Sequence, residues 1–174
     1  YLGLPSRSSN TTSSNCVDAQ SAYESEMSLW GSVMGHVNLV NHAAGWLEGG
    51  LTASFEKLIL DAEMLQMMTQ TLEPIEVNED ELALATIAEV QPGGHHFATE
   101  HTLARYQTAF YPTLLSTREN FESWEEQGAQ DTATRANTIW KKLLEEYEQP
   151  EMNESILTAL NEYVDVRKKE IAQN

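Results

Sequence analysis

Cysteine and positively charged residues are scarce in this sequence, and long apolar runs are absent from it. The single cysteine, Cys16, excludes a disulfide within the chain and favours a reducing compartment, so we expect a cytoplasmic protein. No stretch of about 18 apolar residues occurs, so we expect no transmembrane helix. The first fifteen residues also lack the basic and apolar regions of a signal peptide. Because the chain begins with Tyr1 rather than Met, we expect it to be part of a longer gene product.

Lysine and arginine together number only 10 against 27 acidic side chains, which gives a formal net charge of −17. Residues 51–100 contain ten acidic side chains and one lysine. Nucleic acids bind clusters of basic side chains that displace counterions from the phosphates, and anionic membranes attract the same clusters. The sequence therefore predicts no nucleic-acid partner and no membrane partner. A solvated acidic surface is the simplest explanation of the charge.

Several catalytic signatures are also missing. The chain has no GxGxxG, P-loop or GxSxG motif, which argues against Rossmann oxidoreductases, P-loop kinases and serine hydrolases. His95, His96 and His101 lie close together in the sequence, but no cysteine pair or HExxH motif accompanies them. The spacing of His96 and His101 does not place both rings on one helix face. We therefore predict no metal site, and expect one of these histidines to hydrogen-bond the backbone near the Gly-Gly turn.

What the sequence does contain is a strong helical pattern. Side chains that cap helix N-termini precede periodic apolar segments, and glycine or proline follows several of them. The predicted helices cover approximately residues 18–34, 54–73, 78–90, 99–110, 116–126, 131–149 and 153–170. Three of these helices carry apolar residues that we expect to be buried. They are Phe55, Leu58, Ile59, Ala62, Leu65, Met68 and Leu72; Ala136, Trp140, Leu143 and Tyr147; and Ile156, Leu157, Leu160 and Val164.

Two short strands are predicted, at residues 1–6 and 37–41, with a polar loop at residues 7–17 between the first strand and the first helix. The predicted fold class is predominantly α with two or three short strands. A strand–helix–strand–helix order at the start of the chain is typical of the last two repeats of a (β/α)₈ barrel. We therefore expect residues 1–73 to be the last, incomplete part of such a barrel, and residues 74–174 to form a helical C-terminal extension packed on it.

The segment NLVNHAAGWLEGGLTAS, residues 38–54, is the most informative part of the chain. Small residues surround His42, Trp46 and Glu48 between a predicted strand and a predicted helix. In α/β folds, polar and aromatic side chains at such positions form ligand sites, and an indole face attracts methylated ammonium groups. The alternative is an ordinary strand-to-helix loop with a buried histidine, in which Trp46 fills space and Glu48 faces water.

Several segments together resemble the trimethylamine methyltransferase family. They are LGLPSRSS, DAQSAYESEM, NLVNHAAGWLEGGLTASFEKLILDAEMLQMM, PGGHHFATEHTL and ENFESWEEQGAQDTATRANTIWKKLLEEY, and the match is co-linear over nearly the whole chain. The resemblance implies a (β/α)₈ barrel whose earlier strands lie upstream. It also implies transfer of a methyl group from a methylated amine to the cob(I)alamin of a separate corrinoid protein, so that this chain itself binds no cofactor.

Some members of that family use pyrrolysine to activate trimethylamine. The corresponding position falls in the loop at Thr11 and Thr12, which has only ordinary residues. The chain therefore looks more similar to the branch without pyrrolysine, which includes glycine betaine methyltransferases. A quaternary ammonium group leaves as a neutral amine and needs no activating residue, so the protein has to position it and exclude water.

On this basis the candidate substrate-binding residues are His42, Trp46, Glu48, Thr11, Thr12, Gln20 and His96, and the substrate is a quaternary or tertiary methylated amine such as a betaine. We expect the isolated chain to be inactive, because it lacks most of a barrel. Exposed apolar edges of an incomplete barrel also predict a homo-oligomer. Two alternatives remain open: a non-catalytic helical module that docks a corrinoid protein or mediates oligomerisation, and a divergent member without catalytic activity.

Overall fold

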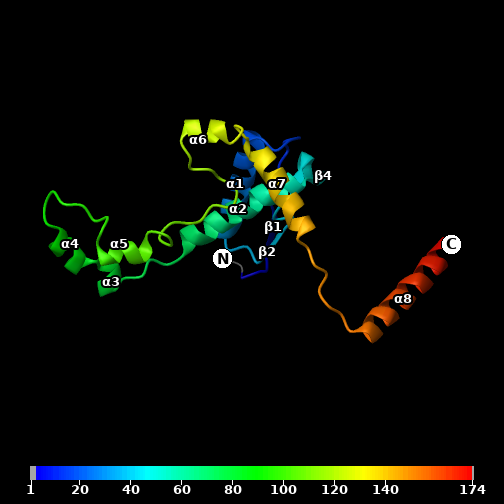
Figure 1. Ribbon diagram of the computed structural model, residues 1–174. Helices are drawn as coiled ribbons and strands as arrows, with labels where there is room; N and C mark the ends of the chain where they lie inside the picture. The colour runs from blue at the N-terminus through cyan, green and yellow to red at the C-terminus, as the bar shows by residue number, and fades with distance from the viewer. Residues whose placement is uncertain (1–2, 174) are drawn as a thin grey trace. The chain divides into compact units, whose positions relative to one another are not determined.

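The computed structural model describes residues 3–173 and places most of them in helices, with four very short strands among the described residues (Figure 1). The predicted fold class, predominantly α with few short strands, is confirmed. The chain divides into two compact units, Tyr1–Lys141 and Lys142–Asn174. The boundary predicted at residue 73, between the last barrel repeats and the helical C-terminal extension, stays a prediction.

The first unit begins with a strand–helix–strand–helix order. β1 (Arg7–Ser9) and β2 (Leu39–Asn41) are parallel, with Arg7 opposite Leu39 and Ser9 opposite Asn41. α1 (Ala19–Met34) connects them, and α2 (Phe55–Leu72) follows β2. Parallel strands joined through a helix are the βαβ unit of α/β folds. The order of elements is therefore as predicted, although two strands alone do not form a barrel.

The position of the first strand was predicted wrongly. β1 lies at residues 7–9, inside the segment expected to be a loop; residues 1–2 of the expected strand lie outside the described residues, and residues 3–6 are not a strand. The sequence Arg-Ser-Ser has no apolar alternation, which is the pattern that predicts a strand. Pairing with β2 forms this strand, and the Ser32 hydroxyl of α1 donates a hydrogen bond of 2.8 Å to the Ser8 hydroxyl.

The starts of the main helices agree with their predicted caps. The Asp18 carboxylate accepts a 2.9 Å hydrogen bond from the Ser21 N–H at the start of α1, and Gly35 ends that helix. The Ser54 hydroxyl accepts from the Lys57 N–H at the start of α2, at 3.2 Å. Asn153 likewise caps α8 (Glu154–Ala172). A side-chain acceptor at these positions satisfies a backbone donor that the helix itself leaves free.

The helices between residues 74 and 149 are shorter than predicted. The expected helix at 78–90 is broken at Ala83, which has φ 49°, into α3 (Glu79–Leu82) and α4 (Leu84–Val90). The expected helix at 99–110 is α5 (Glu100–Arg105). The Arg105 guanidinium bonds to the carboxylates of Asp80 and Glu81, so α5 is joined to α3 (Figure 1).

α6 (Phe121–Glu126) is capped by Asn120, whereas the predicted cap was Ser116. The reason is a tertiary contact, because the N–H groups of Leu114, Leu115 and Ser116 all donate to the carboxylate of Glu63 on α2. That contact holds Ser116 outside any helix. α7 (Thr132–Glu145) ends before the predicted end at Pro150.

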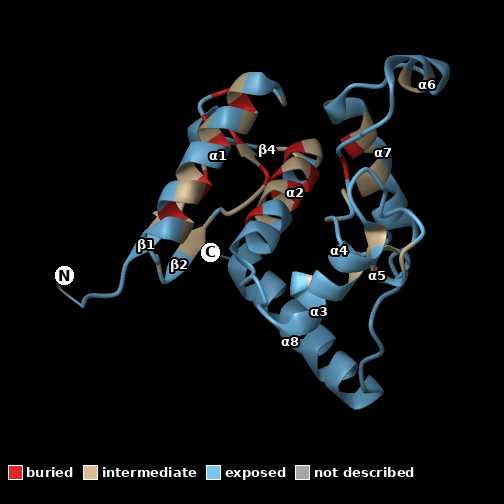
Figure 2. Ribbon diagram, turned by 90° about the vertical axis from the view of Figure 1, so that its left-hand side faces the viewer, coloured by how far each residue is buried: buried red, intermediate tan, exposed pale blue. Residues whose placement is uncertain are grey.

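The hydrophobic core is small. It consists of Ile59, Leu115 and Ala136, with Leu60, Ile139 and Trp140 packed against it. Figure 2 shows buried residues on α1 and α2 and beside α7. The buried residues of α2 include the charged Lys57, Asp61 and Glu63 as well as Ile59 and Met68. Charged groups are buried only when they have partners, so specific polar contacts contribute to holding this region together.

The predicted apolar stripes are only partly buried. On α2, Phe55, Leu58 and Leu72 are 55%, 43% and 47% exposed. Leu143 on α7 and Tyr147, which follows the end of that helix, are exposed, and so are all residues of α8. The periodicity of these stripes was identified correctly, but the conclusion that other described residues bury them was wrong. Across residues 3–173, no helix has the length and apolar character needed to cross a bilayer.

Candidate functional site

The carboxyl ends of β1 and β2 bring the loop after Ser9 against the segment after Asn41. The Asn10 side-chain amide donates to the Ala43 carbonyl oxygen at 2.8 Å. The Gly49 N–H donates to the Thr12 carbonyl at 2.8 Å, and the Glu48 N–H donates to the Ser14 carbonyl at 2.9 Å. Parallel strands present their following loops at one edge, which is where α/β folds form ligand sites. The candidate residues on these two loops therefore lie together.

The segment after β2 is a hairpin that the sequence did not predict. β3 (Trp46–Leu47) pairs antiparallel with β4 (Thr52–Ala53), and the short 3₁₀ turn η1 (Glu48–Gly50) joins them. Gly45 has φ 87°, a left-handed conformation that residues with a side chain rarely adopt. A Cβ there would make only ordinary contact with Leu58, at 3.4 Å, so the backbone turn rather than lack of space favours glycine at this position.

His42 and Glu48 both adopt a left-handed backbone, with φ 53° and φ 54°. For residues other than glycine this conformation costs of the order of 1–3 kcal/mol each, and it is found preferentially at functional sites. The two residues lie before and after the strand β3. The bond that Asn10 donates to Ala43, and those that Glu48 and Gly49 donate to the first loop, help to hold the backbone in these conformations.

The rings of His42 and Trp46 pack edge to face, with centroids 5.2 Å apart and planes at 86°. Such aromatic pairs contribute about 0.5–1.5 kcal/mol beyond the area they bury. His42 Nδ1 lies 3.5 Å from the Ser9 hydroxyl, and Trp46 is partly buried. The two candidate side chains are therefore in contact with one another. Glu48 is exposed, and its carboxylate accepts a 2.7 Å hydrogen bond from the Thr52 hydroxyl across the hairpin.

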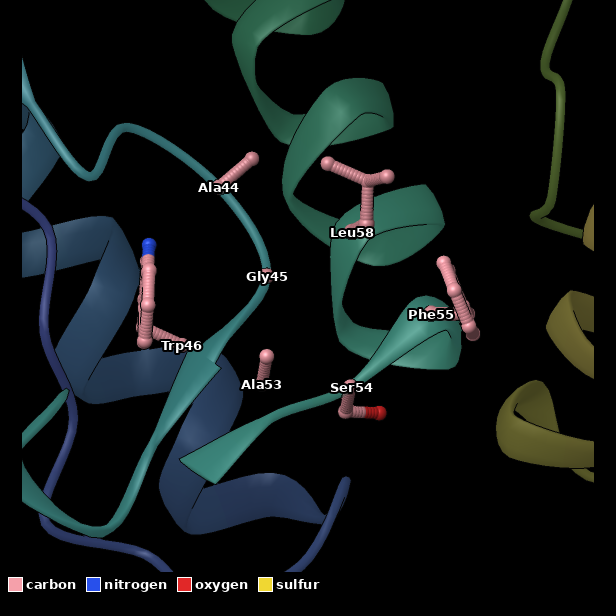
Figure 3. A pocket seen from close by; sticks show the side chains of 7 residues that line it. All are labelled: Ala44, Gly45, Trp46, Ala53, Ser54, Phe55 and Leu58. Carbon is pink, nitrogen blue, oxygen red and sulfur yellow. The ribbon is translucent and has the colours of Figure 1, made fainter. Parts of the chain in front are cut away.

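A hollow of about 180 Å³ lies between this hairpin and the first turn of α2 (Figure 3). Its lining is mostly apolar and consists of Ala44, Gly45, Trp46, Ala53, Ser54, Phe55 and Leu58. Figure 3 shows the Trp46 ring directed away from Phe55 and Leu58, and neither His42 nor Glu48 lines the hollow. The hollow is smaller than the roughly 300–1,000 Å³ typical of ligand pockets. The described residues therefore do not enclose His42, Trp46 and Glu48 in one cavity.

Glu24 on α1 organises the first loop, and the sequence analysis did not identify it. Its carboxylate accepts hydrogen bonds from the Thr12 hydroxyl, the Gln20 amide at 2.9 Å, and the N–H and hydroxyl of Ser13. These donors, that of Thr12 above all, lower the pKa of Glu24 to about 2. The polar groups of Thr12 and Gln20 are thus bonded to Glu24. The one available signal was the spacing of Gln20 and Glu24, four residues apart on a helix.

A fully buried ion pair fixes the second loop, and the sequence analysis also missed it. The Lys57 ammonium on α2 bonds to the Asp61 carboxylate one turn later, and donates to the Ser25 hydroxyl of α1 at 2.7 Å. The other carboxylate oxygen of Asp61 accepts from the Gly45 N–H at 2.9 Å. Burial lowers the pKa of Lys57, and Asp61 offsets part of that effect. The pair therefore joins α1, α2 and the residue that precedes Trp46.

Asn10 is fully buried, and its side-chain oxygen has no hydrogen-bond partner among the described residues. Buried polar atoms nearly always have a partner, so an unpaired oxygen at the edge of β1 and β2 calls for an explanation. Thr11, the next residue, lies near the backbone of the glycine turn, since a Cβ on Gly50 would be 3.5 Å from the Thr11 methyl carbon. Asn10 and Thr11 therefore both lie against the loop that follows β2, and Asn10 is part of the candidate site.

His96 lies elsewhere in the first unit. It is exposed in the loop between α4 and α5, and its carbonyl oxygen accepts from the Thr99 N–H and hydroxyl. The His96 contact therefore uses its main chain, whereas the His101 ring hydrogen-bonds the backbone, with Nε2 3.0 Å from the Asp80 carbonyl oxygen. One of the three histidines thus bonds the backbone as expected, although its partner lies in α3 rather than at the Gly-Gly turn. Within residues 3–173, no three His, Cys, Asp or Glu side chains come close enough together to hold a metal ion.

Comparison with known proteins identifies the family. The model of the family described as trimethylamine methyltransferase (MTTB) matches residues 1–172. The chain belongs to this family. It is 33% identical to the glycine betaine methyltransferase of Desulfitobacterium hafniense over 174 residues, which are 99% of this chain and 36% of that protein.

The same family relationship holds for trimethylamine methyltransferases. The chain is 28% identical to MttB2 of Methanosarcina mazei over 95% of its own length and 33% of the relative. It is 29% identical to MttB of Desulfitobacterium hafniense over 98% of its own length and 34% of the relative. The chain thus spans about a third of the length of these relatives, and they are methyltransferases by name.

Proposed function

We propose that the protein containing this chain transfers a methyl group from a quaternary or tertiary methylated amine, such as a betaine, to the cob(I)alamin of a corrinoid protein. The observation that carries this proposal is the match to a glycine betaine methyltransferase over 99% of the chain, at higher identity than to the two trimethylamine methyltransferases compared above. The ordinary residues Thr11 and Thr12 in the first loop are consistent with a substrate that needs no activation. A cytoplasmic location is part of the proposal.

In this reaction the N–CH₃ bond breaks and its electron pair stays on nitrogen. A quaternary ammonium, or a tertiary amine that is bound in its protonated form, then leaves as a neutral amine. Cob(I)alamin supplies the electron pair that bonds the methyl carbon. In this proposal the methyl acceptor is a corrinoid that a separate protein carries and presents to the site. The protein's own contribution is to hold the N–CH₃ bond in line with the acceptor and to exclude water.

We assign the cation site to the edge formed by His42, Trp46 and Glu48. An indole face attracts a methylated ammonium group by about 0.5–2 kcal/mol, and a nearby carboxylate adds Coulombic attraction. In this proposal His42 hydrogen-bonds a substrate carboxylate and Thr11 forms one wall of the site. Thr12 and Gln20, whose polar groups are bonded to Glu24, support that wall, and His96 is a more distant candidate. Because the hollow in this chain does not enclose these side chains, residues from the rest of the longer protein complete the site in this proposal.

The test uses the full-length gene product with a cob(I)alamin-loaded corrinoid protein and a panel of betaines and methylamines. We expect loss of the Co(I) absorption with at least one betaine, and no turnover by the 174-residue chain alone. Trp46→Leu should raise KM by about 2- to 30-fold, whereas Trp46→Phe, which keeps an aromatic face, should raise it less. If no member of the panel is demethylated, the proposed activity is wrong. If Trp46→Leu leaves KM unchanged, the assignment of Trp46 to the cation site is wrong.

The alternative of a non-catalytic interaction module is favoured by the many exposed apolar side chains on α2 and on residues 143–171. It predicts that the chain binds a corrinoid protein without methyl transfer. His42→Ala would then leave this binding unchanged while, under the leading proposal, it would lower turnover by the full-length protein.

A further inference from the structure

The buried ion pair of α2 is also connected to the backbone of the candidate site. Lys57, Asp61 and Ser25 are each 0% exposed, and residues of this chain alone cover them. Removing two charges from water is costly, and apolar side chains of similar volume often hold helices together equally well. Contact between α1 and α2 therefore does not by itself explain why a charged pair lies here. The carboxylate makes a second bond, however, which an apolar side chain cannot replace.

The Asp61 carboxylate divides its two oxygens between the ion pair and the site. Oδ1 accepts from the Lys57 ammonium, and Oδ2 accepts from the Gly45 N–H at 2.9 Å. The Gly45 carbonyl oxygen in turn accepts from the Ser54 N–H at 2.9 Å. Figure 3 shows Gly45 and Trp46 on the segment that runs beside α2. The peptide groups on both sides of Gly45 are therefore bonded to α2 and to its cap, at the point where Trp46 follows.

The contacts of Gly45 determine how precisely Trp46 is placed. Glycine has no side chain to restrict its backbone, so the residue after it is fixed only as well as the peptide groups of the glycine are bonded. A charged acceptor makes a stronger hydrogen bond than a neutral one, which makes the Asp61 carboxylate a firm anchor. The Trp46 ring, which packs on His42 with centroids 5.2 Å apart, therefore takes its position in part from α2.

We propose that Asp61 is a positioning residue: its carboxylate, held by Lys57, fixes Gly45 and so places the Trp46 ring against the methylated cation. This inference rests on the proposed function, because it takes Trp46 to be part of the cation site. Asp61 is fully buried and acts without contacting the substrate. The placement matters because an indole attracts a cation only when the cation lies over the ring face, within about 6 Å of its centroid.

The first experiment compares two variants of the full-length protein that make the same chemical change on the same helix. Asp61→Asn replaces one oxygen by an NH₂ group, so one of its two hydrogen-bond partners then faces a donor. Glu63→Gln is the matched control, because Glu63 is also buried but bonds to residues 114–116. With glycine betaine and a cob(I)alamin-loaded corrinoid protein, Asp61→Asn should raise KM by up to the roughly 2- to 30-fold expected for Trp46→Leu, and change kcat less. Glu63→Gln should change KM less than about twofold.

A double-mutant cycle separates positioning from general damage to the fold. If Asp61 acts through Trp46, its loss has nothing further to misplace once the indole is gone. The double variant Trp46→Leu, Asp61→Asn should therefore have a KM within about twofold of that of Trp46→Leu alone. Effects that multiply, equal increases of KM in Asp61→Asn and Glu63→Gln, or an unchanged KM in Asp61→Asn, would overturn the proposal.

A second variant keeps the test decisive if Asp61→Asn does not fold. Lys57→Met, Asp61→Leu leaves no charge buried, and such replacements are often neutral for stability. It still removes the acceptor of the Gly45 N–H, so it should raise KM as Asp61→Asn does while circular dichroism shows the helix content retained. An unchanged KM in this folded variant would equally refute the positioning role.

Hydrogen exchange distinguishes failure of this inference from failure of the proposed function, because it needs no turnover. In both Asp61 variants the Gly45 amide should exchange faster, whereas in Glu63→Gln the faster amides should be those of residues 114–116. If the unmodified protein demethylates no methylated amine, the proposed function is wrong, and so is the role of Trp46 on which this inference rests. Turnover by the unmodified protein, together with unchanged exchange at Gly45 in Asp61→Asn, would refute the positioning role alone.

Discussion

In residues 3–72 the strands and helices are joined by buried polar side chains, whereas in residues 143–173 the apolar side chains lie on exposed helix faces. Lys57 is fully buried and bonds to the fully buried Asp61 and Ser25, and Asn10 joins the two loops of the candidate site. Leu143 and the large apolar side chains of α8 are exposed. The first region fixes backbone positions within the chain, and the second has apolar surface that the described residues do not cover.

The largest difference in stability between the two regions is expected when the buried ion pair of the first region is removed. Lys57→Met leaves Asp61 as a buried charge without its cation, which costs about 3–5 kcal/mol when one member of such a pair is removed. We expect a loss of that size in the free energy of unfolding, measured by urea denaturation. The same substitution at Lys142, whose side chain is 70% exposed, should change stability by no more than about 0.5 kcal/mol.

A second change distinguishes loss of the pair from loss of volume. In the double variant Lys57→Met, Asp61→Leu no charge remains buried, so part of the stability should return. The Gly45 N–H still loses its acceptor, and so recovery should be incomplete. A loss below about 1 kcal/mol for Lys57→Met alone would mean that the pair does not hold the two helices together.

The next effect concerns Glu63, which carries the contact between α2 and the segment before α6. Glu63→Gln replaces one carboxylate oxygen by an NH₂ group. That group cannot accept hydrogen bonds, so at least one of the backbone N–H groups of residues 114–116 loses its acceptor. We expect a loss of about 1–3 kcal/mol and faster hydrogen exchange at these three amides. Glu73→Gln, at the exposed end of α2, is the control. Unchanged exchange at residues 114–116 would contradict this role of Glu63.

The sequence predicted the features of this fold that depend on neighbouring residues. Helix caps at Asp18, Ser54 and Asn153 act within one turn, so local pattern was enough to find them. β1 depends on a partner strand 32 residues away, and the start of α6 is displaced from Ser116 by a contact with Glu63, 53 residues away; periodicity reveals neither. At the site, the pattern grouped His42 with Trp46 but gave no sign that Asp61 holds Gly45, because that contact crosses between elements.

A smaller effect should appear as a pH dependence at the junction of α2 and α7. The Glu56 carboxylate accepts hydrogen bonds from Asn137 at 2.6 Å and from the Trp140 indole at 2.8 Å, and these lower its pKa from 4.5 to about 2. The unfolded chain binds this proton at higher pH, so the contribution of Glu56 is present above pH 4.5 and is lost as the pH falls towards about 2.

The measurement is the urea midpoint of unfolding as a function of pH between these two values. Glu56→Gln should remove part of the slope, and Asn137→Ala should reduce it by raising the pKa of Glu56. Glu24 has a pKa lowered to about 2 as well, so some slope should remain in both variants. An unchanged slope in Glu56→Gln would show that this carboxylate is not bonded to α7 in solution.

The smallest effect is expected at the surface ion pair between Lys142 and Glu146, whose charged atoms are 3.6 Å apart and whose side chains are 70% and 62% exposed. Water and salt screen such a pair, so it contributes about 0–1 kcal/mol. Lys142→Ala should lower the unfolding free energy by no more than that, with the effect disappearing at high salt. A larger, salt-independent loss would mean that the end of α7 is covered in solution, and that the exposed surface of residues 143–173 is already occupied in the isolated protein.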